Sequence, residues 1–294
     1  MNGPQRRILL VGASGQVGWE LQRSLAPLGE VFIPGRERLN LAQVDSIRPY
    51  LAEIQPTLIV NAAAYTAVDK AEEEPEQALA INGKAPGVLA ETARQQGAAL
   101  IHYSTDYVFD GQGVYPYREG DTPRPLNVYG QTKLAGEQAI AAVGGAYLIL
   151  RTSWVYGLRG HNFLLTMQRL AQEREVLTVV NDQWGTPTWS RLIAEGTAQI
   201  VAQSRGQRQD SIPQAGIYHL SCGGKTTWHG FAQAILARLA QGAGPVARLE
   251  AIPSADYPIP ARRPAFSCLD NTRIKDTFGI QLPSWRTALE LALS

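Results

Sequence analysis

The chain has 294 residues, of which 45% are hydrophobic, and its 27 lysines and arginines nearly balance its 26 aspartates and glutamates. This length allows one large or two modest domains, and the near-neutral charge excludes the strongly basic surface of a typical nucleic-acid-binding protein. The two cysteines and four histidines follow no metal-ligand spacing, and no apolar run is long enough to cross a membrane. We therefore expect a cytoplasmic protein in a reducing compartment, without a bound metal and with no nucleic acid or membrane among its partners.

Short apolar runs alternate with helical patterns over the first half of the chain. The sequence predicts helices at residues 19–25, 75–96 and 127–143, and strands at 7–11, 31–33, 57–60, 99–103 and 146–150. Alternation of this kind implies parallel strands joined by helical crossovers. The predicted fold class is therefore α/β, a doubly wound parallel sheet of the Rossmann type.

The pattern becomes less regular after about residue 155. It predicts helices at 161–173, 190–202 and 227–240, and strands at 176–180 and 217–220. We interpret residues 1–154 as the sheet domain and residues 155–294 as mainly a smaller, partly interleaved lobe that closes over a cleft. In this interpretation, strands or helices near residues 188–216 can belong to the sheet domain although they follow residue 154.

A glycine-rich loop, with Gly12, Gly15 and Gly18, follows the first predicted strand and precedes a helix. Glycines in this position let the backbone approach a pyrophosphate, which the helix N-terminal amides then bind. A tight turn that needs a positive φ is the structural alternative. The small side chains of Ala62–Ala64, after the third strand, would let a cofactor lie against the backbone, although core packing would explain them as well.

The end of the second predicted strand bears on the choice of cofactor. A Rossmann site that selects NAD places an acidic residue there for the ribose hydroxyls. This chain has Gly35, Arg36, Glu37 and Arg38 instead. Arg36, supported by Arg38, could bind a 2′-phosphate, which favours NADPH. Two solvated arginines explain the segment equally well, and Glu37 could still hold a ribose, so NADH stays open.

A phenol and an ammonium are paired on the helix predicted at 127–143. Tyr129 and Lys133 are four residues apart and so share one helix face. A neighbouring cation favours phenolate, so we expect the pKa of Tyr129 to be lowered and the phenol to exchange protons near neutral pH. Thr105 ends the fourth strand, where ligands of doubly wound sheets bind, and could hydrogen-bond a carbonyl oxygen that Tyr129 protonates. An ordinary surface pair and a strand-end cap are the alternatives.

These motifs together resemble the extended short-chain dehydrogenase/reductase family. More narrowly, the chain resembles the branch of that family that reduces dTDP-4-dehydro-β-L-rhamnose at C4 to dTDP-L-rhamnose. The resemblance covers nearly the whole chain, in segments 15–21, 61–72, 103–109, 126–137, 151–156, 181–188 and 260–264.

The resemblance implies that NADPH or NADH delivers hydride to the sugar carbonyl. Tyr129 would protonate the forming alkoxide, Thr105 would hydrogen-bond the carbonyl, and Lys133 would lower the pKa of Tyr129 and hold the nicotinamide ribose. The implied cofactor-binding residues are Gly12, Gly15, Gln16, Val17, Gly18, Arg36, Asn40, Leu41, Ala62, Ala63, Ala64, Tyr103, Tyr129 and Lys133.

The resemblance also implies residues that bind the nucleotide-sugar substrate. Trp154 would border the sugar or stack on it, although a core aromatic is the plainer interpretation. Arg262 and its neighbour Arg263 lie in a Pro-bounded loop that suits a diphosphate, because arginine forks match phosphate oxygens. The implied substrate-binding residues are Thr105, Asp106, Tyr107, Trp154 and Arg262.

Two positions bear on metal binding and on the reaction type. Some members of the family dimerise around magnesium held by carboxylates; Glu20 matches one such position, but Arg191 stands where another carboxylate is expected. We therefore expect no metal, while a homodimer remains compatible with the sequence. Tyr107 stands where related dehydratases have a glutamate base, which favours reduction. Another nucleotide-sugar epimerase or dehydratase, or a non-catalytic NADP-binding regulatory subunit, is the alternative.

Overall fold

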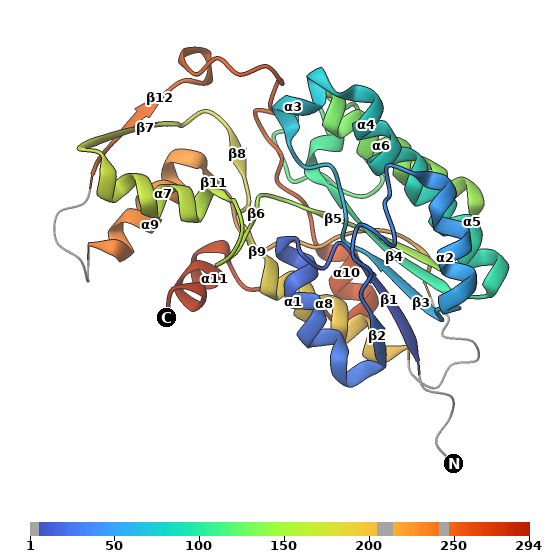
Figure 1. Ribbon diagram of the computed structural model, residues 1–294. Helices are drawn as coiled ribbons and strands as arrows, with labels where there is room; N and C mark the ends of the chain where they lie inside the picture. Colours follow the sequence, from blue (N-terminus) through green and yellow to red (C-terminus); the bar gives the residue numbers. More distant parts are fainter. Residues whose placement is uncertain (1–5, 205–213, 241–246) are drawn as a thin grey trace.

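The structure is a computed structural model, and it describes residues 6–204, 214–240 and 247–294. Within these residues a central sheet of six strands has the order β10-β5-β4-β3-β1-β2, and every pairing in it is parallel (Figure 1). Its strands are β1 (Arg7–Val11), β2 (Glu30–Phe32), β3 (Leu58–Asn61), β4 (Ala99–Thr105), β5 (Tyr147–Thr152) and β10 (Gly216–His219). The carboxyl ends of these strands therefore meet at one edge of the sheet, where such folds bind ligands.

Helices cover both faces of this sheet. Ile8 and Leu10 of β1 pack on one face and Leu9 and Val11 on the other, because successive side chains of a strand point to opposite sides. The first face is covered by α1 (Gln16–Leu25), α8 (Ser190–Gln203) and α10 (Thr272–Phe278), and the second by α2 (Ile47–Ile54), α5 (Ala85–Gln96) and α6 (Val128–Val143). Burial on both faces explains why the strands read as continuous apolar runs, and the doubly wound prediction is confirmed.

A second body with its own hydrophobic core lies to one side of the sheet (Figure 1). In this lobe β7 pairs in parallel with β12, while the short strands pair as β6 with β9 and β8 with β11. Its elements are β6 (Val155–Tyr156), α7 (Phe163–Glu173), β7 (Val176–Val180), β8 (Trp184–Gly185), β9 (Thr188–Trp189), β11 (Thr226–Thr227), α9 (Trp228–Leu239), β12 (Arg248–Ile252) and α11 (Trp285–Ala292).

The chain returns to the sheet after it has built the first part of the lobe. Helix α8 packs against α1, and β10 pairs with β5 at the edge of the sheet. Between residues 188 and 216 the chain thus adds one helix and the start of one strand to the sheet body, with residues 205–213 outside the described residues. The sheet body is consequently discontinuous in sequence.

The helix predicted at 75–96 is interrupted. The structure has α4 (Pro75–Leu79), a π-helical turn (Ala80–Lys84) and then α5, preceded by α3 (Val68–Glu73). Asn82 in the π turn binds the main chain of Tyr65 through both side-chain atoms, accepting from its N–H at 2.8 Å and donating to its carbonyl at 3.0 Å. Turns of this kind occur often at functional sites. This one fixes the segment after β3 to the helices on the second face of the sheet.

Close contact between this π turn and α6 predicts the effect of one substitution. A Cβ added at Gly136 would lie 2.1 Å from the carbonyl oxygen of Asn82. We expect Gly136→Ala to lower the free energy of unfolding by about 1–3 kcal/mol, because overpacking a dense core forces backbone shifts. Urea denaturation followed by circular dichroism measures it. Gly120→Ala, which adds its methyl to open space, is the matched control; equal stability of the two variants would contradict the close packing.

Candidate active site

Helix α6 begins directly beside the end of β4. Its N-cap is Asn127, whose Oδ1 accepts a hydrogen bond from Gly130 N–H at 2.8 Å. The Nδ2 of the same side chain donates to the main-chain carbonyl of Arg262 at 2.8 Å. One asparagine therefore starts the helix, as caps of this type do, and also fixes the loop that approaches from the far end of the chain.

Tyr129 lies in the first turn of α6, half-buried and edge-on to Tyr107, with the ring centroids 5.9 Å apart. Burial raises the pKa of Tyr129 to about 12, and a hydrogen bond with Thr105 acts in the opposite direction. The phenol is therefore protonated at neutral pH.

The predicted lowering of the Tyr129 pKa by Lys133 is wrong for this structure. Lys133 is buried, and its Nζ donates to the main-chain carbonyl of Tyr103 at 2.6 Å and lies 3.2 Å from Nε2 of His102. Both partners belong to β4, so the side-chain nitrogen of Lys133 is bound to the strand. Tyr129 and Lys133 do share the helix face that their spacing predicts.

Thr105, Asp106 and Ser153 form a buried polar cluster where β4 and β5 end. The Thr105 hydroxyl donates to Asp106 Oδ1 and the Ser153 hydroxyl to Asp106 Oδ2, each at 3.0 Å, while Tyr107 N–H donates to the Thr105 oxygen. Burial raises the pKa of Asp106 to about 6 in spite of these hydrogen bonds. The strand ends thus present hydroxyls and a carboxyl beside Tyr129.

The glycine loop has the geometry of a phosphate cradle. Gly12 has φ +83°, and a Cβ there would lie 2.4 Å from the main-chain nitrogen of Ala63; a Cβ at Gly18 would lie 2.1 Å from Gly12 O. Gly15 is exposed, and no side chain caps the start of α1, which has no acidic residue in its first turn. Two glycines therefore permit tight packing of the loop, while the helix N–H groups stay open to an anion.

Several predicted cofactor residues contribute in ways other than expected. Gln16 joins the loop to the lobe, because its Oε1 accepts from Asn162 Nδ2 at 2.9 Å. The phenol of Tyr103 is buried against Thr197 of α8 at 2.7 Å, so only its main chain faces Lys133. Leu41 is a core residue.

The remaining cofactor residues lie at the ends of the strands. Arg36 is exposed, whereas Arg38 forms hydrogen bonds with Glu53 at 2.7 and 2.9 Å and so is not free to support it. Asn40 accepts from Ala42 N–H at 3.1 Å in a local turn. Val17 and Ala62–Ala64 are half-buried around the glycine loop.

Two of the predicted substrate residues, Trp154 and Arg262, lie outside the β4 end. Trp154 is half-buried, has the left-handed φ of +44°, and stacks on Trp228 with ring centroids 3.5 Å apart. Such backbone strain is concentrated at functional sites. Of the two arginines, Arg262 is exposed, while Arg263 lies over the Tyr107 ring and pairs with Asp69 at 2.6 Å. Arg263 Nη1 is buried without a hydrogen-bond partner in the structure.

Glu20 and Arg191, the two positions that bear on metal binding, each form an ion pair within their own helix. Glu20 lies 3.6 Å from Arg23, and Arg191 lies 2.9 Å from Glu195. Across the part of the chain that the structure describes, no cluster of three histidine, cysteine or acidic side chains could hold a metal ion. The helices of those same residues include none that is long and apolar enough to span a membrane.

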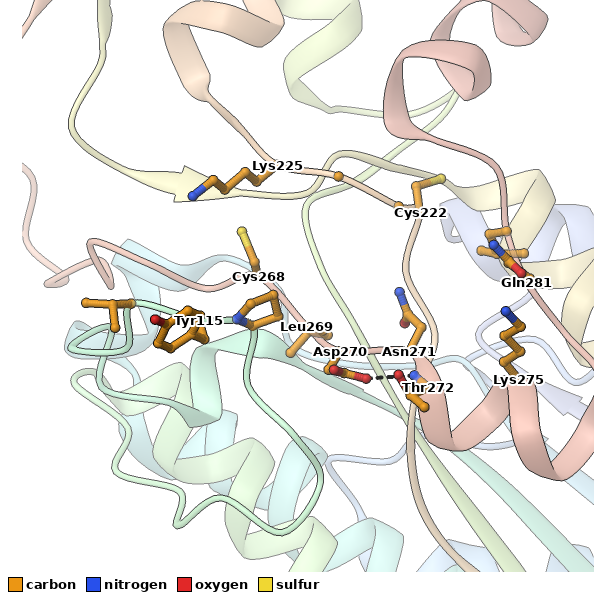
Figure 2. Close-up of a pocket in the computed structure, with 15 residues that line it drawn as sticks. Tyr115, Cys222, Lys225, Cys268, Leu269, Asp270, Asn271, Thr272, Lys275 and Gln281 are labelled. Carbon is orange, nitrogen blue, oxygen red and sulfur yellow. Dashed lines mark hydrogen bonds between the residues drawn. The ribbon is translucent and has the colours of Figure 1, made fainter.

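A cavity of about 550 Å³ opens at another place, between the loop at Val114–Pro116, the segment Cys222–Lys225 and the start of α10 (Figure 2). None of the predicted catalytic, cofactor or substrate residues lines it. The predicted site at the strand ends and this cavity are therefore separate places on the molecule.

The sequence did not predict four residues of the site: His102, Glu137, Ser153 and Asp69. Ser153 follows the predicted fifth strand, so the rule that ligands bind beyond strand ends could have found it. Glu137 is four residues after Lys133 on the same face of α6, but its buried pairing with Arg151 joins distant segments and leaves no local pattern. His102 and Asp69 likewise act through partners that are remote in sequence.

Comparison with known sequences identifies the family. Residues 6–294 match the model of the RmlD substrate binding domain. A dTDP-4-dehydrorhamnose reductase of Burkholderia thailandensis is 49% identical over 291 residues, which cover 98% of both chains. A dTDP-4-dehydrorhamnose reductase of Escherichia coli strain K12 is 44% identical over 293 residues, which cover 98% of this chain and 97% of the relative.

Solved structures agree with the sequence matches. A dTDP-4-dehydrorhamnose reductase from Bacillus anthracis str. Ames, in complex with NADP, is 33% identical, has a TM-score of 0.89 and is matched over 98% of both chains. A UDP-glucose 4-epimerase from Thermus thermophilus, in complex with NAD, has a TM-score of 0.77 at 20% identity over 98% of this chain and 97% of that one, and it shares the fold alone. The chain belongs to the family of dTDP-4-dehydrorhamnose reductases.

Proposed function

We propose that this protein reduces the C4 carbonyl of dTDP-4-dehydro-β-L-rhamnose, giving dTDP-L-rhamnose, with NADPH or NADH as the reductant. The observation on which the proposal rests is the protonated phenol of Tyr129 beside the Thr105 hydroxyl at the end of β4. A reductase needs a proton donor that is still protonated at neutral pH, and burial supplies this condition here. The family and the glycine loop support the same reaction.

Tyr129 is the proton donor in this mechanism, and Thr105 orients the carbonyl oxygen. In this structure the Thr105 hydroxyl donates its single hydrogen to Asp106 at 3.0 Å, so it has to turn from Asp106 to donate to the carbonyl oxygen. Asp106, Tyr107, Trp154 and Arg262 are proposed to contact the nucleotide sugar, with Arg263 added because of its buried, unpartnered Nη1. Hydrogen-bond donors aimed at the carbonyl oxygen stabilise the charge that develops on it.

The coenzyme is proposed to bind along the glycine loop, with its pyrophosphate at the start of α1. When bound, a reduced nicotinamide supplies the hydride. The chain's own contribution is Gly12, Gly15 and Gly18 around the phosphates, Lys133 near the nicotinamide ribose, and Arg36 at the adenosine end. The NADP complex of the Bacillus anthracis relative supports NADPH.

The alternatives fit the site less well. A dehydratase needs a base after Asp106, but burial raises the pKa of the Tyr107 phenol above its ordinary value, so Tyr107 is no base near neutral pH. A non-catalytic subunit does not need the Thr105 and Tyr129 arrangement. We also propose a cytoplasmic location, since Cys222 and Cys268 are buried free thiols, while the homodimer stays a prediction.

Loss of the Tyr129 hydroxyl tests the proton donor. The wild-type protein is expected to oxidise NADPH in a one-to-one ratio with dTDP-L-rhamnose formed, and Tyr129→Phe to lower kcat about 10²–10⁴-fold, the contribution of a general acid. Stopped-flow absorbance of NADPH measures both. Tyr115→Phe, at a site 80% exposed, is the control with unchanged kcat. Near-normal turnover in Tyr129→Phe, or no NADPH oxidation by the wild type, would refute the assignment.

The coenzyme preference depends on Arg36. We expect Arg36→Ala to raise the Kd for NADPH about tenfold or more and to leave the Kd for NADH unchanged, since a hydrogen bond to a charged phosphate contributes about 1.5–3 kcal/mol. Isothermal titration calorimetry gives both constants. Arg38→Ala is the matched control, because that guanidinium is paired with Glu53. Equal losses for the two coenzymes would remove the case for NADPH.

The raised pKa of Asp106 predicts a pH-dependent stability. The folded protein binds the Asp106 proton more tightly than the unfolded chain does, so stability is lost as the pH rises through about 6. Asp106→Asn should therefore gain about 1.4 kcal/mol of stability relative to wild type between pH 5 and pH 8, because about one pH unit of this interval lies below the folded pKa of about 6. Urea unfolding at both pH values measures the difference.

The exposed Asp256→Asn serves as the control for this measurement, with no change in relative stability between the two pH values. A difference between Asp106→Asn and wild type that is the same at pH 5 and pH 8 would contradict the raised pKa.

A further inference from the structure

A chain of buried polar groups lies beneath the proposed active site. It joins Asn61 at the end of β3, His102 in β4 and Lys133 in α6, all of them buried. Asn61 Nδ2 lies 3.1 Å from His102 Nδ1, and His102 Nε2 lies 3.2 Å from Lys133 Nζ. Buried polar groups need complementary partners, so each proton in this chain can be assigned.

The assignment starts at Asn61. Its Oδ1 accepts a hydrogen bond from the main-chain N–H of Ala63 at 3.2 Å. A main-chain N–H can only donate, so it fixes the amide with Oδ1 toward Ala63 and Nδ2 toward the histidine. Since Nδ2 is also a donor, His102 Nδ1 has to accept.

The assignment continues through the imidazole ring. A neutral histidine has one N–H and one acceptor nitrogen, and burial lowers the pKa of His102 well below its ordinary value. With Nδ1 as the acceptor, Nε2 has the hydrogen and points it at Lys133 Nζ. An ammonium has no lone pair to receive it, whereas a neutral amine does. The neutral amine still donates to the Tyr103 carbonyl at 2.6 Å.

The charges around Lys133 do not restore the ammonium. Glu137 on the same helix face raises the Lys133 pKa, but its carboxylate is already bound twice by Arg151 of β5, at 2.9 and 2.6 Å. Elsewhere on α6 the neighbour is the neutral phenol of Tyr129. No carboxylate among the described residues forms an ion pair with Lys133, and burial lowers its pKa to about 8.

We propose that His102, held in its Nε2–H tautomer by Asn61, is a positioning residue that sets the charge of Lys133 and favours its neutral amine. Protonation of Lys133 then requires either two donors to face each other or the loss of the Asn61 contact with Ala63. Lys133 consequently exchanges its proton near neutral pH instead of remaining a permanent cation. The functional meaning of this inference rests on the proposed role of Lys133 in the reduction.

The tautomer can be read directly from the imidazole nitrogens. The chain has four histidines, and the other buried one, His219, places its Nδ1 3.2 Å from the carbonyl of Asp270, which requires the opposite tautomer. Long-range ¹H–¹⁵N spectra of histidine-labelled, full-length protein should show His102 with hydrogen on Nε2 and His219 with hydrogen on Nδ1. Hydrogen on Nδ1 of His102 would overturn the proposal.

The charge of Lys133 can be titrated in the same full-length protein. The chain contains only five lysines, so ¹³Cε-labelled lysine gives a simple spectrum, assigned with Lys133→Met. We expect Lys133 to titrate near pH 8, below the other lysines. Titration of all five together would overturn the proposal.

Asn61→Asp supplies the matched perturbation. The carboxylate keeps the contact with Ala63 N–H but accepts from His102 Nδ1, so Nε2 becomes an acceptor for an ammonium. The Lys133 midpoint should rise by about one pH unit or more, a tenfold change in proton binding, while the His219 tautomer stays unchanged. An unaltered midpoint and tautomer would refute the inference. These spectra need no turnover, so an absent reductase activity would count against the proposed function alone.

Discussion

Two buried polar links hold helix α6 against the sheet, and the geometry of the proposed active site depends on them. Lys133 is bound to the main chain of β4, and Glu137, one turn later, is bound by Arg151 of β5. Breaking the second link would leave a charge without a partner in the interior, which costs about 3–5 kcal/mol. Helix α6 is therefore unable to slide along the strands, and Tyr129, one turn before Lys133, is held beside Thr105.

The same burial that fixes the geometry also moves the protonation equilibria of the site toward neutral pH. The pKa of Asp106 is raised to about 6 and that of Lys133 is lowered to about 8, in both cases mainly because the charged form is poorly solvated. Burial thus brings the pKa values of an acidic and a basic side chain to within about two units of each other. Perturbed groups of this kind gather at functional sites. Here Asp106 acts on the phenol of Tyr129, which stays protonated, and Lys133 lies one turn further along α6.

Much of the fold could be predicted because the sheet is covered on both faces. Strands β1, β3, β4 and β5 read as apolar runs, and the glycine loop and the pair Tyr129 and Lys133 follow from local spacing. The half-buried β12 shows no such run, and the short helices α3 and α10 bury too few residues to give a periodic pattern. Helices α2 and α11 do bury residues at helical spacing, so a closer reading of the sequence could have predicted them. The local sequence pattern thus predicts best those strands that are buried along their whole length.

The local sequence pattern could not predict which partner a polar side chain binds. Lys133 turns to a carbonyl of β4, and Arg38 turns to Glu53, fifteen residues away. Arg262 and Arg263 are adjacent in sequence, yet only the second faces Tyr107. Each of these choices depends on a partner that only the folded chain brings near.

The discontinuous sheet body has a consequence for how a protein of this kind can change. The chain leaves the sheet after β5, returns with α8 and β10, leaves again for α9 and β12, and returns with α10 before α11 ends it in the lobe. A cut at residue 154 would remove two of the three helices on one face and expose β5 as an edge. The lobe therefore cannot be exchanged between proteins as one continuous cassette, because any single cut also divides the sheet body.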